Sequence, residues 1–89
     1  MIFVYDIASN EHNKITFDYD EEARERLDAK LKGDTLSVFA NREGMITLAK
    51  LLLKMAYGSY SDGFHVHLRK DFNADNPEIL TVVLSRDDQ

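Results

Sequence analysis

Two histidines stand two residues apart in the segment FHVHLRK, positions 64–70. If this segment is a strand, His65 and His67 share one face, and both imidazoles could bind one metal ion. A third ligand would have to come from Asp18, Asp20 or another acid across the sheet. Because two histidines are a minimal ligand set, the pattern favours a polar sheet face used for contact over a metal site.

A cluster of acids is the second group whose chemistry could matter. Its members are Asp18, Asp20, Glu21, Glu22 and Glu25. Paired carboxylates perform acid–base catalysis or bind a divalent cation when they are partly desolvated. These acids lie between a predicted strand and a predicted helix, where solvent reaches them and where the helix dipole favours negative charge. The cluster therefore indicates a solvated surface, or attraction of a basic protein partner, rather than catalysis.

The residue patterns that other catalytic mechanisms require are absent from the sequence. The chain has no cysteine, and none of its serines stands in a nucleophile elbow. Gly44 and Gly58 do not belong to a phosphate-binding glycine loop. Tyr57 and Tyr60 fit two roles, as interface anchors or as half-buried covers of the core. An enzyme is therefore the less favoured interpretation, and no cofactor is expected.

The longest periodic apolar segment, NREGMITLAKLLLKMAYG, predicts a helix over residues 41–57. Asn41 is a good N-cap, and Glu43 places negative charge in the first turn. Gly58 is expected to end the helix as a left-handed residue. At Gly44, the missing side chain would let another backbone or a partner approach the first turn.

The predicted buried face of this helix consists of apolar residues that recur at steps of three and four. They are Met45, Leu48, Ala49, Leu52, Met55 and Ala56, with Ile46 and Leu53 widening the face. A narrow polar stripe of Thr47, Lys50 and Lys54 remains. We therefore expect a helix that is mostly buried, with Leu52 in the core.

The other elements follow from alternation and turn residues. Strands are predicted at 1–8, 15–20, 35–40, 64–70 and 78–85, and a surface helix runs from Asp20 to Lys32 before Gly33. The first two strands form a hairpin. This order, β-β-α-β-α-β-β, predicts one α+β domain spanning residues 1–89. Its mainly antiparallel sheet has about five strands and carries the 41–57 helix across one face.

Charge and composition limit the function classes. The net charge is −5, with no cluster of basic and aromatic residues, so nucleic-acid binding is disfavoured. Residues 1–34 carry nine acids against five bases, whereas residues 35–70 carry two acids against five bases. No apolar run is long enough to cross a bilayer, and the N-terminus does not resemble a signal peptide. A cytoplasmic protein without membrane contact is expected.

The order of residues from position 35 onward resembles the immunity protein 32 family of bacterial polymorphic toxin systems. The resemblance rests on Asn41-x-Glu43-Gly44-Met45, on Leu48-Ala49 and Leu52-Leu53, and on His65-Val66-His67-Leu68. It covers about residues 35–85. Two positions depart from the family pattern: Ala40 replaces a glycine, and Arg69 stands where the family often has an acid.

The resemblance implies a small non-catalytic protein that binds a cognate protein toxin and blocks it. In this interpretation the acids from Asp18 to Glu25 attract the toxin, and His65 and His67 contribute contacts. Asn41, Glu43 and Gly44 have a structural role. A homodimer is a second possible assembly. The alternative from another class is a small metal- or ligand-binding enzyme that uses His65 and His67 with a nearby acid.

Overall fold

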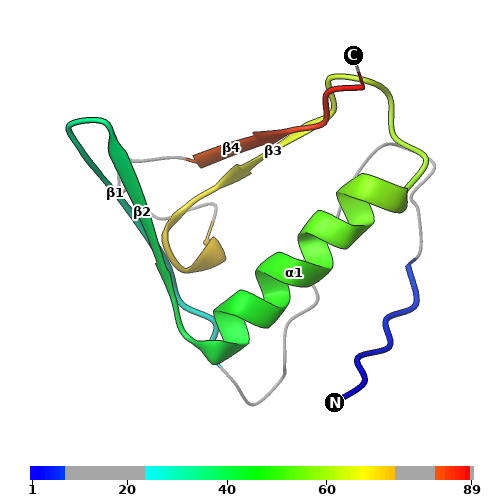
Figure 1. Cartoon of the computed structure of the whole chain (residues 1–89), viewed down its shortest axis with the longest axis horizontal. Helices are drawn as coiled ribbons and strands as arrows, with labels where there is room; N and C mark the ends of the chain where they lie inside the picture. Colours follow the sequence, from blue (N-terminus) through cyan, green and yellow to red (C-terminus); the bar gives the residue numbers. More distant parts are fainter. Residues whose placement is uncertain (8–23, 74–81, 89) are drawn as a thin grey trace.

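One α-helix and two antiparallel two-stranded sheets make up the described part of the chain, residues 1–7, 24–73 and 82–88 of the computed structural model (Figure 1). The elements are β1 (Leu27–Lys32), β2 (Thr35–Ala40), α1 (Arg42–Tyr57), β3 (His65–Leu68), the 3-10 turn η1 (Lys70–Phe72) and β4 (Val82–Ser85). β1 pairs with β2, and β3 pairs with β4. The α+β class is confirmed. The five strands and two helices are not, because the described residues contain four strands and one α-helix.

β1 stands where the sequence predicts a helix over residues 20–32, whereas β2 is the strand predicted over residues 35–40. Residues 24–26 have no regular structure, and Leu27–Lys32 is a strand, so the helix prediction is wrong over its described part. Residues 20–23 lie outside the described residues. The good helix formers of β1 adopt a strand because pairing with β2 outweighs their intrinsic helix propensity.

Register and turn chemistry explain this hairpin. Each apolar residue of β1 stands opposite an apolar residue of β2, so one face of the sheet is apolar; the pairs are Leu27–Ala40, Ala29–Val38 and Leu31–Leu36. Gly33 opens the two-residue turn with a φ of 60°, a value that suits the first turn position of a tight hairpin. The Asp34 that follows completes the turn. The alternating apolar residues of β1 therefore match the two-residue period of a strand.

α1 has the predicted N-terminus and a different C-terminus. Asn41 caps the helix by accepting a hydrogen bond from the Gly44 N–H at 2.8 Å, and Glu43 lies in the first turn. Gly58 follows the last helical residue with φ −73° and ψ 163°, so it is extended and the predicted left-handed cap is wrong. A Cβ on Gly58 would overlap the Tyr60 ring. Glycine is therefore required there for a close contact rather than for its handedness.

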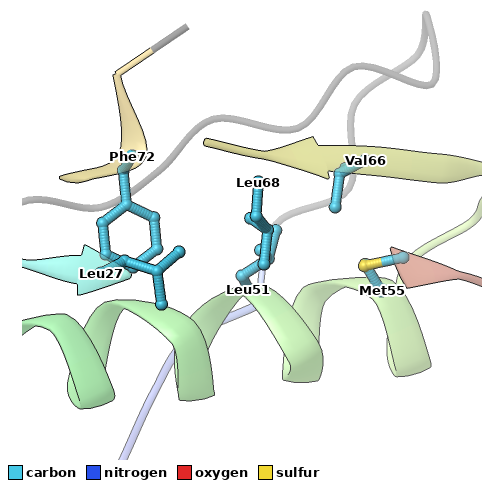
Figure 2. Close-up of a cluster of buried hydrophobic side chains, with 6 residues drawn as sticks. All are labelled: Leu27, Leu51, Met55, Val66, Leu68 and Phe72. Carbon is cyan, nitrogen blue, oxygen red and sulfur yellow. The ribbon is translucent and has the colours of Figure 1, made fainter. Parts of the chain in front are cut away.

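The core lies between α1, the apolar side of β3 and the start of β1 (Figure 2). Its buried side chains are Leu27, Leu51, Met55, Val66, Leu68 and Phe72. Val66 and Leu68 point inward while His65 and His67 point outward, as the alternation predicts. Phe72 lies just beyond the strand predicted over residues 64–70. It belongs to the core, and it and Asp71 both adopt positive φ within η1, which contacts β1.

The buried face of α1 is rotated relative to the predicted one. Its members are Gly44, Thr47, Leu51, Lys54 and Met55. Leu51 is only 2% exposed, whereas the predicted core residue Leu52 is 47% exposed. Met45 and Ile46 are also exposed. Because apolar residues surround most of this helix, periodicity could not determine its rotation. The close approach of Arg26 to Gly44 lies on the side that is buried.

The two ends of the chain lie on either side of α1. Residues 1–7 form no strand, so the strand prediction is wrong there, and its continuation beyond residue 7 lies outside the described residues. Lys50 Nζ lies 5.7 Å from the centre of the Tyr5 ring. At the other end, Arg86 Nη1 donates to the Gly58 carbonyl oxygen at 2.9 Å and so satisfies an acceptor at the end of α1. No helix among the described residues has the length and apolar character required to span a membrane.

Candidate functional site

Asn41 joins the start of α1 to the segment before β1. Its Oδ1 accepts two backbone hydrogen bonds, from the Gly44 N–H at 2.8 Å and from the Arg26 N–H at 2.9 Å. Its Nδ2 donates to the Arg24 carbonyl oxygen at 2.7 Å. One side chain therefore caps the helix and also fixes a segment fifteen or more positions earlier in the sequence. We call these contacts the Asn41 clamp.

Gly44 makes the clamp possible. A Cβ at this position would overlap the carbonyl oxygen of Arg26 and would lie 2.9 Å from Asn41 Oδ1. Any side chain would therefore push the segment before β1 away from the helix. The sequence indicated a close backbone approach at Gly44, and the structure identifies residues 24–26 as the approaching segment. Asn41 and Gly44 therefore link the start of α1 to residues 24–26.

The two histidines form an exposed face on β3. Their ring centroids are 5.2 Å apart, and the rings are tilted by 55°. His65 Nδ1 lies 3.2 Å from the Gly63 carbonyl oxygen. On β4, Ser85 stands opposite His65 and Val83 opposite His67, and both are exposed. We call His65, His67, Val83 and Ser85 the histidine face. It offers a small mixed surface of imidazole, hydroxyl and apolar groups.

Around these histidines, the described residues supply no third ligand for a metal ion. Within residues 1–7, 24–73 and 82–88, no three His, Cys, Asp or Glu side chains are grouped closely enough to hold a metal ion. Asp18, Asp20, Glu21 and Glu22 lie outside the described residues. Glu25 is described and partly buried, in the segment that the Asn41 clamp holds. The histidine face by itself is suited to contact.

An apolar cavity of about 90 Å³ lies where the two sheets meet α1. Every residue around it is a leucine or a valine: Leu27, Val38, Leu48, Leu52, Leu68, Val82 and Leu84. Because these side chains supply no acid, base or nucleophile, the cavity suits an apolar group and no reaction. Leu52 and Val38 are only partly covered, so the cavity continues into exposed apolar surface. Sequence patterns do not predict this cavity, because it depends on how the two sheets meet.

A second cavity, of about 200 Å³, lies between β1 and the end of β3, and charged side chains form part of its lining. Lys30, Arg69 and Lys70 contribute positive charge, and Asp28 is the acid beside them. Two of the basic residues of the segment 35–70, Arg69 and Lys70, thus lie beside β1.

The two tyrosines after α1 have different roles. Tyr60 is buried and stacks on Phe64, with ring centroids 4.4 Å apart and an angle of 11° between the planes. It therefore covers the core. Tyr57 is largely exposed and remains available for contact with another molecule.

Comparison with known protein families gives a match to one family model, described as immunity protein 32, over residues 35–86. The match covers more than half of the 89 residues. It begins at β2, contains the clamp residues Asn41 and Gly44 together with the histidine face, and ends at Arg86. No curated protein and no solved structure matches the chain.

Proposed function

Since the chain belongs to the immunity protein 32 family, we propose that it binds a cognate bacterial toxin and neutralises it by direct docking. The observation that carries this proposal is the family match over residues 35–86. Docking requires a complementary surface and no catalytic groups. We further propose that the protein acts in the cytoplasm as part of a polymorphic toxin system.

We assign the first encounter with the toxin to the acids Asp18, Asp20, Glu21, Glu22 and Glu25. Residues 1–34 carry a net charge of −4, from nine acids and five bases. Toxins that act on nucleic acid are commonly basic near their active sites, so an acidic inhibitor gains association rate by charge complementarity. The histidine face supports the bound complex, because His65, His67 and Val83 combine exposed polar and apolar groups.

The test uses the toxin encoded beside the gene and a variant with Asp18→Lys, Glu21→Lys and Glu22→Lys. Surface charges act mainly on the association rate, and salt screens them. We expect this variant to associate more slowly at low salt while its dissociation rate changes little. The difference should shrink as the salt concentration rises. Stopped-flow mixing measures both rates.

A matched control separates local from total charge. The variant Asp6→Lys, Asp34→Lys and Asp87→Lys changes the net charge by the same amount at other positions. Its association rate should fall less than that of the first variant. Equal slowing by both variants would assign the effect to total charge, and no slowing by either would remove the acids from the mechanism. The double variant His65→Ala/His67→Ala should raise the dissociation rate of the toxin complex.

A further inference from the structure

The β1–β2 hairpin has a defined pattern of inward and outward backbone groups. Gly33 and Asp34 form its two-residue turn, so Lys32 and Thr35 are the closing pair. In such a hairpin the closing pair exchanges two hydrogen bonds, and bonded pairs then alternate with non-bonded pairs. The residues of the non-bonded pairs therefore direct their N–H and C=O groups away from the partner strand. On β2 these residues are Leu36, Val38 and Ala40.

The corresponding outward groups on β1 are partly capped by carboxylates. The Leu27 N–H donates to Asp71 Oδ1 at 3.2 Å, and the Ala29 N–H donates to Asp28 Oδ1 at 2.9 Å. Among the described residues, no acceptor of this kind stands at the Leu36 or Val38 N–H. Within the described residues, the β1 edge of this sheet is therefore partly capped, and the β2 edge, which we call the open edge, has no such cap.

The open edge also lacks the devices that usually prevent strand pairing. Exposed edge strands in monomeric proteins commonly carry lysine, proline or a bulge. Thr35–Ala40 contains no charged residue and no proline. Apolar side chains are exposed on both of its faces: Leu36 is 51% and Val38 42% exposed on one face, and Phe39 is 54% exposed on the other. Figure 1 shows the hairpin projecting from the rest of the fold.

We propose that the open edge of β2 pairs antiparallel with β2 of a second copy of this chain, about a two-fold axis through Val38. In this register Val38 stands opposite Val38 of the second copy, and Leu36 stands opposite Ala40. Each of these pairs exchanges two N–H···O bonds through the outward groups, as a bonded antiparallel pair does. On the other face, Ser37 stands opposite Phe39.

The residues of β2 complement one another across this axis, and we therefore propose a second copy of the chain as the partner. A large residue meets a small one in the Leu36–Ala40 and Phe39–Ser37 pairs, and no charged side chain opposes another across the new edge. The two-fold axis is perpendicular to the sheet, so the apolar faces of both hairpins lie on the same side of a four-stranded sheet. A contact made mainly through one strand edge belongs to the small, weak class of interfaces. The dimer should therefore dissociate in the micromolar range.

Sedimentation of the full chain at concentrations from about 5 to about 500 µM, which bracket a micromolar dissociation constant, tests the proposal without any toxin. The wild type should shift from monomer to dimer. Val38→Lys places two like charges opposite each other and should raise the dissociation constant about tenfold or more. Leu31→Lys is the matched control: it adds the same charge to the same face, on β1, and should leave the dimer unchanged.

A second measurement remains informative if Val38→Lys does not fold. The chain has no cysteine, so Val38→Cys introduces a single thiol, and its position on the two-fold axis predicts a covalent dimer under mild oxidation. Leu31→Cys should give little covalent dimer.

A wild type that stays monomeric throughout, a dimer that survives Val38→Lys, or equal crosslinking by both cysteine variants would each overturn the proposal. A monomeric wild type whose toxin binding is lost in Val38→Lys would assign the edge to a strand of the toxin. Because immunity is measured separately, failure of the dimer leaves the proposed function intact.

Discussion

At the scale of single residues, Gly44 and Asn41 perform one task together. Asn41 uses both ends of its amide, accepting from Gly44 and Arg26 and donating to Arg24. Gly44 supplies the space through which the Arg26 carbonyl passes. A motif that the sequence presents as a helix cap is thus also the link between α1 and the β1–β2 hairpin. Together these two residues hold the start of α1 against residues 24–26, which lead into the hairpin.

Gly44→Ala tests this close approach. Alanine at an ordinary helix position is favoured over glycine by about 1 kcal/mol. Here the added Cβ would overlap a backbone oxygen, and relieving such overpacking typically costs about 1–3 kcal/mol. We therefore expect a net loss of stability in denaturant unfolding. The reverse change at an exposed position of the same helix, Ala49→Gly, should cost about 1 kcal/mol by propensity alone. A Gly44→Ala protein more stable than the wild type would contradict the close approach.

At the scale of elements, the rotation of α1 decides which residues stabilise the fold. The helix was predicted from its apolar period, and the bounds and the N-cap are confirmed. The buried face is not, since Thr47 and Lys54 are buried while Leu52 is half exposed. A helix that is apolar over most of its circumference has no single preferred face, so the neighbouring elements select one.

Comparing Leu51→Ala with Leu52→Ala tests directly which face of α1 is buried. Removing the side chain of the fully buried Leu51 should lower the free energy of unfolding by about 2–5 kcal/mol. Leu52→Ala should cost less than half of that, because Leu52 is 47% exposed in the wild type. Chemical denaturation of both variants gives the comparison. Equal losses, or a larger loss for Leu52→Ala, would mean that α1 presents the other face to the core.

The hairpin shows where sequence reasoning failed and why. Leu27 to Lys32 consists of good helix formers, yet its apolar residues also alternate, and Gly33 supplies the positive φ that a tight turn needs. Local propensity favoured a helix, and pairing with β2 prevailed. Phe72 lies in the core where it and Asp71 have positive φ, and the sequence does not predict these backbone angles. By contrast, the outward direction of His65 and His67 followed from alternation alone.

At the scale of the whole molecule, charge is unevenly distributed along the chain. Residues 35–70 carry a net +3, with five bases against two acids, whereas residues 71–89 carry a net −4, with one base against five acids. The basic part contains β2, α1 and β3 and includes Asn41, Gly44, His65 and His67. In the proposed mechanism, a toxin with a basic surface meets the acids of residues 1–34 first, and residues 35–86 supply the framework and the exposed contacts.

The most direct test of the account is a titration of the neighbouring toxin with this protein, measuring the remaining toxin activity. Docking predicts that activity falls in proportion to the amount of protein added and reaches zero at a fixed stoichiometry. It also predicts that active toxin is recovered when the complex is dissociated. Toxin that keeps its full activity at excess protein would contradict the account. So would permanent inactivation by a small fraction of one equivalent, because that result requires catalysis.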